Sequence, residues 1–348
     1  MMQKRNLWAV LFVMLLMALS VNGAVAEDDV LRSGDYQYRV LEDGTAEITS
    51  YSGGDSVLKI PNTLDGKTVT SIGDEAFSGC RALKSIELPD SVTSMGVNPF
   101  AGCESLKNIR VSPEQPVFAV IDGVLFNKAE KSLICYPAGK QEEAYEVPQG
   151  IQQIKSCAFS VCSFLTSIEL PDSVTSIGDV AFAGCSALTS IELPDSVTSM
   201  GVNPFAGCES LKNIQVSPEQ LVFAVIDGAF FNKAEKSLIC YPAGKQEEAY
   251  EVPQGIQQIK FGAFGECRAL TTIKLPDSVT SIGESAFYDC SSLTSIELPD
   301  SVTSIGDQAF WGCDNLTMTV QRDSYAARYA KDNNLNYTYP DANDWLNN

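Results

Sequence analysis

The sequence predicts a β-rich repeat solenoid in which short strands recur in coils of about 23 residues. The phrase LTSIELPDSVTSIGDQAFWGC at residues 293–313 is repeated with small changes along the chain, and the isoleucine in its strand recurs at steps of 23 or 59 residues. Ala-Phe or Pro-Phe marks eight coils, at Phe77, Phe100, Phe159, Phe182, Phe205, Phe264, Phe287 and Phe310. Eight coils exceed the roughly three that a self-supporting solenoid needs.

Residues 1–26 have the pattern of a secretory signal peptide. Lys4 and Arg5 precede an apolar stretch at residues 7–21, and small residues lead to an expected cleavage between Ala26 and Glu27. The apolar stretch is shorter than the roughly 20 residues of a membrane-spanning helix. We therefore expect a secreted or cell-surface protein with no membrane span after cleavage.

The ends of a solenoid need caps, because they expose an apolar core and unpaired strand edges. Residues 27–57 contain GDYQYRVLEDGTAEITSYSG, whose alternation and Asp-Gly turn predict an N-terminal capping hairpin.

The solenoid is expected over residues 58–317, and the coil at residues 187–209 illustrates its pattern. Its strand alternates, with Ile191 pointing inward and Glu192 outward. Pro194 ends the strand, and the apolar lining is then completed by Val197, Met200, Phe205 and Cys208. One coil cannot bury this lining alone, whereas stacked coils can.

Two inserts, near residues 111–150 and 216–255, account for the 59-residue steps. Asp122-Gly123 and the polar run at 127–132 predict turns between strands, so each insert is expected to contain hairpins. Residues 82–159 and 187–264, offset by 105, differ at seven of 78 positions. The solenoid therefore contains a tandem duplication.

Residues 318–348 are expected to form a C-terminal cap and tail. Ser324 is placed to cap the N-terminus of a helix with an apolar face, and LNYTY at 335–339 predicts a closing strand.

These motifs resemble the BspA-like leucine-rich repeat family of bacterial secreted and surface proteins. The resemblance rests on the repeated I-x-L-P-x-x-V-x-x-I-G-x-x-A-F-x-x-C, the insert DGVLF…SLICYPAGK and the ending SYAARYA, and it covers residues 35–338. It implies a leucine-rich repeat solenoid associated with adhesion, and it carries no enzymatic site. The sequence shows no wall-anchoring segment, so permanent attachment to the cell surface stays open.

Composition argues against catalysis and against nucleic-acid partners. The chain has no histidine, which removes Ser-His-Asp and Cys-His chemistry and histidine-containing zinc sites. Cleavage of the signal peptide removes two basic residues and changes the net charge from −20 to −22, so nucleic acid and anionic membranes would repel the protein. We expect no enzyme activity and no cofactor.

Eleven cysteines in an exported protein would ordinarily suggest disulfides. Eight of them, however, stand three residues after the phenylalanine of each coil, where a column of buried thiols is expected. The expected structural core includes Phe77, Cys80, Phe100, Cys103, Phe182, Cys185, Phe205, Cys208, Phe287, Cys290, Phe310 and Cys313. The redox states of Cys135, Cys157 and Cys240 stay open, and Cys157, at a variable position, is expected to be the most exposed thiol.

The aspartates that follow Leu-Pro form a second column, at Asp90, Asp172, Asp195, Asp277 and Asp300. Such carboxylates can bind Ca²⁺, but Pro-Asp-Ser is also an ordinary turn in which Asp bonds its own backbone. We favour the turn, because no loop supplies six oxygen ligands. Identical carboxylates in every coil also argue against a glycoside hydrolase, which needs two acids in unlike environments.

The candidate partner-binding residues are the outward strand row and the tyrosines of the inserts: Glu87, Glu169, Glu192, Lys274, Glu297, Tyr136, Tyr145, Tyr241 and Tyr250. The alternative is a solvated row that protects strand edges, with the aromatic rings buried in the inserts. We expect a non-catalytic protein that binds proteins, with adhesion to host or neighbouring-cell surfaces as the first hypothesis. A scaffold element of a surface complex is the alternative, and a secreted hydrolase is a remote third.

Overall fold

The computed structural model describes residues 30–340, so the expected cleavage site at Ala26 and Glu27 and most of the C-terminal tail lie outside the described residues. The described chain divides into two compact units. The first contains residues 30–186 and 199–204, and the second contains residues 187–198 and 205–340. The second unit begins where the second copy of the duplication begins, at Ala187.

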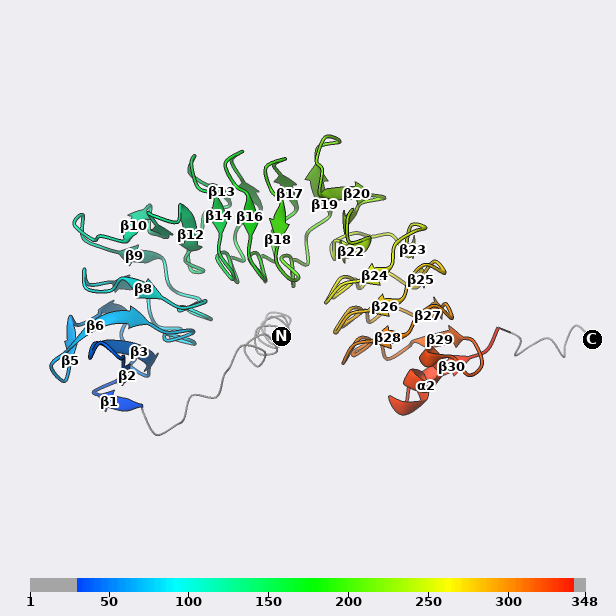
Figure 1. Cartoon of the computed structure of the whole chain (residues 1–348), viewed down its shortest axis with the longest axis horizontal. Helices are drawn as coiled ribbons and strands as arrows, with labels where there is room; N and C mark the ends of the chain where they lie inside the picture. The colour runs from blue at the N-terminus through cyan, green and yellow to red at the C-terminus, as the bar shows by residue number, and fades with distance from the viewer. Residues whose placement is uncertain (1–29, 341–348) are drawn as a thin grey trace, which may run out of the picture. The chain divides into compact units, whose positions relative to one another are not determined.

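The first unit begins with an antiparallel cap (Figure 1). Its strands are β1 (Leu31–Ser33), β2 (Tyr36–Val40) and β3 (Ala46–Tyr51). β3 then pairs in parallel with β6 (Lys67–Ile72), so the first coil extends the sheet of the cap. β5 (Thr63–Leu64) pairs antiparallel with β6.

Each coil contributes two short strands, which form separate parallel ladders. In the first unit the first strands of the coils pair as β4 (Val57–Lys59), β7 (Ser85–Glu87) and β9 (Asn108–Arg110) before the insert, and as β13 (Ala144–Glu146) and β15 (Ser167–Glu169) after it, in a separate sheet. The second strands likewise pair as β6 with β8 (Ser94–Met95), and in another sheet as β14 (Gln153–Ile154), β16 (Ser176–Ile177) and β18 (Ser199–Met200). The sequence pattern predicted the first strand of each coil but not this two-residue second one.

The first insert is a three-stranded meander of β10 (Phe118–Ile121), β11 (Val124–Asn127) and β12 (Ser132–Cys135). Asp122 and Gly123 join the first two strands with φ angles of 50° and 80°, as expected for a tight hairpin turn. β12 pairs in parallel with β14, so the insert rejoins the coil ladder.

The second unit repeats this plan. β17 (Ser190–Leu193) pairs with β19 (Asn213–Val216), and the second insert contains β20 (Phe223–Ile226), β21 (Ala229–Asn232) and β22 (Ser237–Cys240). One ladder continues from β22 through β24 (Gln258–Ile259), β26 (Ser281–Ile282) and β28 (Ser304–Ile305). The other holds β23 (Ala249–Glu251), β25 (Thr272–Lys274), β27 (Ser295–Leu298), β29 (Thr317–Val320) and β30 (Asn336–Thr338).

The C-terminal cap is a helix followed by a strand. Helix α2 (Tyr325–Asp332) begins after Ser324, whose side chain accepts a hydrogen bond from the Ala327 N–H at 3.0 Å. β30 then adds to the ladder beside β29. The β-rich leucine-rich repeat solenoid with inserts and caps that the sequence predicts is thus confirmed.

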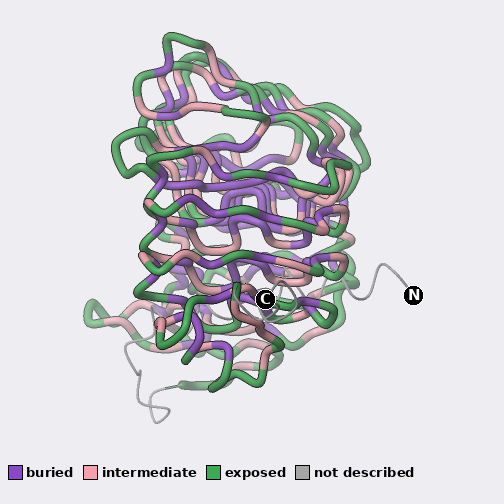
Figure 2. The backbone as a smooth tube through the Cα atoms, turned by 90° about the vertical axis from the view of Figure 1, so that its right-hand side faces the viewer, coloured by how far each residue is buried: buried purple, intermediate pink, exposed green. Residues whose placement is uncertain are grey.

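Stacked aromatic rings form the centre of each unit, and Figure 2 shows buried segments inside the coils. In the second unit the ring centroids of Phe264, Phe287 and Phe310 follow one another at 5.0 Å, with interplanar angles of 10° or less. The column starts at Tyr241, 5.5 Å from Phe264, and ends at Tyr329 of α2, 6.3 Å from Phe310. The caps and inserts therefore supply rings where the repeated phenylalanine is missing.

The glycine of the repeated Ile-Gly pair is required because neighbouring coils touch there. A Cβ atom on Gly306 would lie 2.3 Å from the backbone nitrogen of Glu284, and one on Gly283 would lie 2.6 Å from that of Phe261. Such contacts are shorter than real Cβ atoms allow, so only glycine lets adjacent coils approach.

Replacing Phe287 with Ala should remove a ring that has aromatic neighbours on both sides, and it should lower the free energy of unfolding by about 3–5 kcal/mol. Phe164→Ala is the matched control, because this ring is 45% exposed, and it should cost less than about 1 kcal/mol. Urea denaturation measures both changes. Equal losses in the two variants would show that the column does not govern stability.

Candidate functional site

The outward side chains of the first strand in each coil form a candidate surface, which we call the outward row. In the first unit it contains Lys59, Glu87 and Arg110, which are register partners on β4, β7 and β9. Lys59 Nζ lies 2.6 Å from Glu87 Oε1. Glu87 therefore already has a cationic partner within the protein.

Glu146 and Glu169 continue the row on β13 and β15, where they are register partners and both are exposed. Like charges directly opposite each other on neighbouring strands are destabilising. This part of the row thus carries unbalanced negative charge. In the second unit Glu192 is exposed and stands beside Gln215.

The corresponding row in the second copy contains a cation. Glu251, Lys274 and Glu297 are register partners on β23, β25 and β27, and Lys274 Nζ lies 3.1 Å from Glu251 Oε1. Lys274 occupies the position of Glu169 in the first copy. The duplication therefore presents two differently charged versions of one backbone surface.

The tyrosines of the inserts lie elsewhere. Tyr136, Tyr241 and Tyr250 are between 2% and 8% exposed, and Tyr145 is half-buried against Tyr136. Tyr136 and Tyr241 occupy the place of the coil phenylalanine in the ring column. Tyr145 and Tyr250 are register partners of the inward residues Ile168 and Ile273. They line the core, as in the alternative stated above, and are not part of the candidate surface.

The cysteines of the coils donate hydrogen bonds to the preceding coil. Cys103, Cys185, Cys290 and Cys313 each donate from Sγ to the carbonyl oxygen of the phenylalanine one coil earlier, at 3.0–3.2 Å. Cys162 and Cys267 donate in the same way to Tyr136 and Tyr241, at 3.6 and 3.5 Å. Burial raises the pKa of Cys103 to about 12 and the pKa of Cys290 well above its usual range, so these thiols stay protonated and can donate.

All eleven cysteines are free thiols in the structure, and the twelve expected core residues are buried, except that Cys80 is half-buried. Cys135 and Cys157 are half-buried too, whereas Cys240 is buried. Cys157 is therefore one of three partly exposed thiols. Burial raises its pKa to about 12, with Glu75 and Asp179 adding to the rise, which makes it a weak nucleophile.

Two members of the aspartate column after Leu-Pro accept hydrogen bonds from serines 22 residues further along the chain, which is not the bond to their own backbone that the turn interpretation expects. Asp90 accepts from the Ser112 hydroxyl at 2.6 Å, and Asp195 accepts from the Ser217 hydroxyl at 2.8 Å. Within residues 30–340 no three side chains of the types His, Cys, Asp or Glu are grouped so that they can hold a metal ion. Residues 30–340 also contain no helix with the length and apolar character to cross a bilayer.

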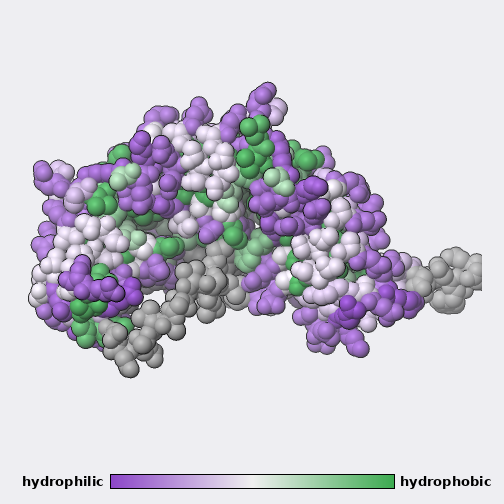
Figure 3. Space-filling model, in the orientation of Figure 1, coloured by the Kyte–Doolittle hydropathy of each residue, from purple (hydrophilic) through white to green (hydrophobic). Residues whose placement is uncertain are grey.

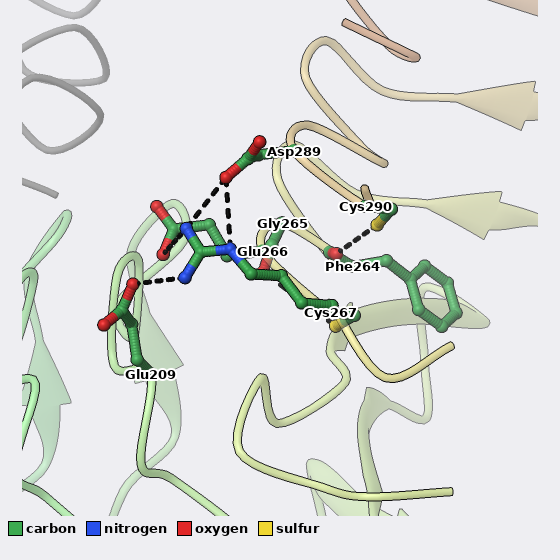
Figure 4. A network of polar contacts seen from close by, with 8 residues as sticks. Glu209, Phe264, Gly265, Glu266, Cys267, Asp289 and Cys290 are labelled. Atoms are coloured by element: carbon green, nitrogen blue, oxygen red, sulfur yellow. Dashed lines mark hydrogen bonds and ion pairs between the residues drawn. The ribbon is translucent and has the colours of Figure 1, made fainter. Parts of the chain in front are cut away.

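A polar cluster that the sequence analysis missed surrounds Arg268 in the second unit (Figure 4). Its guanidinium donates to Glu209 at 2.6 Å and to Asp289 at 2.8 Å, and lies 3.6 Å from Glu266 Oε2. The first copy has Val161 and Ser163 where the second has Glu266 and Arg268. These two charged substitutions in an otherwise regular repeat could have indicated the polar cluster from the sequence alone.

Glu266 is the strained member of this cluster. It is 6% exposed, has a left-handed φ of 61°, and its Oε2 makes no hydrogen bond. The pKa of this carboxyl is raised to about 7, because burial, with help from the carboxylates of Glu209 and Asp289, outweighs the opposing effect of Arg268. The cluster thus brings three carboxyl groups, Glu209, Glu266 and Asp289, around one guanidinium.

The surface between these features is polar. The face drawn in Figure 3 is mostly hydrophilic, and its apolar residues form small separate patches. The outward row recurs from coil to coil within each unit.

Comparison with known proteins identifies the repeats. The sequence profile described as "BspA type Leucine rich repeat region (6 copies)" matches residues 56–131, 138–247 and 243–328. No curated protein matches the chain significantly.

Solved structures with the same fold come from bacteria. A leucine-rich cell surface protein from Faecalibacterium prausnitzii is 28% identical, with a TM-score of 0.54, and the match covers 91% of this chain and 96% of that one. The pneumococcal vaccine antigen PcpA is 22% identical, with a TM-score of 0.51 and coverage of 84% and 81%. A leucine-rich repeat protein from Eubacterium ventriosum is 20% identical, with a TM-score of 0.51 and coverage of 80% and 93%.

The charge difference between the two copies predicts opposite effects on stability. Lys274→Glu should place three glutamates in register and lower the free energy of unfolding by about 0.5–1 kcal/mol, whereas Glu169→Lys should raise it by a similar amount. Both effects should shrink at 1 M salt, since the groups are exposed. Thermal denaturation at low and high salt measures them. Shifts of the same sign in both variants would contradict the register argument.

Glu266→Gln should stabilise the protein at pH 8 and have little effect at pH 5. Because the folded protein holds the proton up to a pKa of about 7 and the unfolded chain only to about 4.5, the wild-type protein loses stability as pH rises through this window. The neutral amide avoids the loss, so the variant should gain up to about 3 kcal/mol at pH 8. Melting temperatures at the two pH values test this, and an equal difference at both would rule it out.

Proposed function

Because the chain belongs to the BspA-type leucine-rich repeat family, we propose that it is an exported, non-catalytic protein that binds other proteins and acts in adhesion to host or neighbouring-cell surface components. Export is supported by the signal pattern of residues 1–26. The similar Faecalibacterium prausnitzii protein is described as a cell surface protein.

The outward row carries this proposal. Glu169, Glu192 and Glu297 are exposed, stand at the same point of their coils and make no ion pair within residues 30–340. Within each unit a parallel strand ladder fixes the backbone that carries these side chains: Glu169 stands beside Glu146, Glu192 beside Gln215, and Glu297 beside Lys274. Weak contacts spaced along such a surface combine through effective concentration.

Charge indicates the character of the partner. The chain has 44 acidic and 24 basic residues, and the exposed part of the row is mainly acidic. A partner with a basic surface would therefore be attracted, and its association rate should fall as salt rises. Nucleic acid is repelled by the same charge.

The chain without residues 1–26 should bind immobilised extracellular-matrix proteins or host cells in a saturable way. Glu169→Lys/Glu192→Lys should weaken this binding at least tenfold, because it reverses the charge at two points of the row. Glu114→Lys/Glu219→Lys is the matched control, since both residues are exposed acids outside the row and the net charge changes equally. Surface plasmon resonance measures the affinities of the unsubstituted chain, the row variant and the control.

Absence of binding across a broad panel of matrix proteins and cells would contradict adhesion. In that case capture of a protein from the producing bacterium's own envelope would favour the scaffold role. Equal weakening by the row variant and by the control would show that overall charge, and not the row, carries the binding.

A further inference from the structure

The last two coils break the repeat at the position directly after the coil phenylalanine. The residue that follows the coil phenylalanine is small in six coils: Ser78, Ala101, Ser160, Ala183, Ala206 and Gly265. In the last two coils it is Tyr288 and Trp311. Small residues satisfy the coil geometry at this position, so the fold itself does not require two large aromatic rings there.

These two rings stack on each other. Their centroids are 5.0 Å apart and their planes differ by 12°. Backbone hydrogen bonds set this register, since the Glu266 N–H donates to the Tyr288 carbonyl at 2.7 Å and the Asp289 N–H donates to the Trp311 carbonyl at 2.8 Å. The pair is therefore built by two consecutive coils of the second unit.

Trp311 is the last ring of this stack, and a second ring packs on only one of its faces. Tyr329 of α2 closes the inner column at Phe310, but within residues 30–340 the indole of Trp311 has no ring partner besides Tyr288. Trp311 is 57% exposed, although it has the largest apolar side chain in the last coil. Because Tyr288 covers one face of the indole, the exposed area includes the other face.

The last coils carry an excess of acidic residues. Glu284 and Asp307, in neighbouring turns, repel each other, which adds to the rise that burial causes in the pKa of Glu284. Residues 261–340 contain ten acidic and five basic residues. A cationic group near Trp311 would thus be favoured by both the ring and the charge.

We propose that Trp311 is a docking point for a basic segment of a protein partner, with an Arg or Lys side chain stacked on its open face and attracted by the net negative charge of the last coils. Indole is the best aromatic acceptor for such a cation, and a planar guanidinium can continue the stack. A sugar ring is a poorer fit, because the two rings cover each other instead of lying side by side as a platform. This inference rests on the proposed protein-binding function and names one anchor for it.

The test uses the chain without residues 1–26 and with Trp345→Phe, which leaves Trp311 as its single tryptophan. Titration with an arginine octapeptide should change the tryptophan fluorescence in a saturable way. A glutamate octapeptide and chitohexaose should not. Saturation by chitohexaose and not by the arginine peptide would overturn the proposal in favour of a carbohydrate.

Anisotropy of the labelled arginine peptide then compares variants. Trp311→Ala should weaken binding about tenfold and Trp311→Phe less. Trp311→Ala reproduces Ala206 of an equivalent coil, so the variant should fold, which a melting curve checks. Phe164→Ala is the matched control for loss of an exposed ring and should have no effect. Equal affinity of the Trp311→Ala variant and the unsubstituted chain would overturn the proposal, because a purely electrostatic attraction survives this change.

The same variant separates this inference from the proposed function. If the wild-type chain binds matrix proteins or cells and Trp311→Ala binds them equally, the docking point is wrong and the proposed function stands. If neither the wild-type chain nor Trp311→Ala binds matrix proteins or cells, the adhesion proposal fails. Trp311 then remains a site for basic segments if the arginine peptide still binds the wild-type chain more tightly than Trp311→Ala.

Discussion

A coil of 23 residues cannot bury its own apolar lining, and every other feature of the structure depends on how neighbouring coils solve this. Phenylalanine rings stack at about the spacing of adjacent strands, 5.0 Å in the last coils. The thiol of each coil donates to the carbonyl beside the previous ring. Glycine allows the close approach that this spacing demands. Ring, thiol and glycine are thus repeated together because they serve one contact between coils.

The caps and inserts obey the same constraint with different residues. Tyr51 precedes the first coil phenylalanine, Tyr136 and Tyr241 each precede the phenylalanine that follows an insert, and Tyr329 ends the column of the second unit. A tyrosine suits an insert or an end because it supplies a ring of nearly the same size. The hydroxyls of Tyr136 and Tyr241 nevertheless make no hydrogen bond within residues 30–340. The free energy gained by packing the rings must therefore exceed the cost of burying these hydroxyls without a partner.

Outside the core the repeats are free to diverge, and function is expected in these differences. Glu169 and Lys274 stand at one position of the duplicated module, as do Val161 and Glu266. Glu169 and Lys274 keep the same strand pairing, and the N–H groups of Val161 and Glu266 both donate to the next coil at 2.7 Å, because these contacts use the backbone. The last coils diverge further with Tyr288 and Trp311, which stack by using the coil spacing that the interior dictates.

The sequence alone determined the solenoid, its period, its inserts and its outward glutamates, because these follow from the spacing of apolar residues. It also contained an overlooked signal: aligning Tyr145-Glu146-Val147-Pro148 with Ile168-Glu169-Leu170-Pro171 places the insert tyrosine inward and adds Glu146 to the row. Only the tertiary structure decided that Arg268 meets Glu209 across 59 residues of chain, and that Trp311 stays exposed while Phe310 is buried. Burial and charge pairing depend on which coils become neighbours, and spacing along one chain does not specify the surroundings of a side chain.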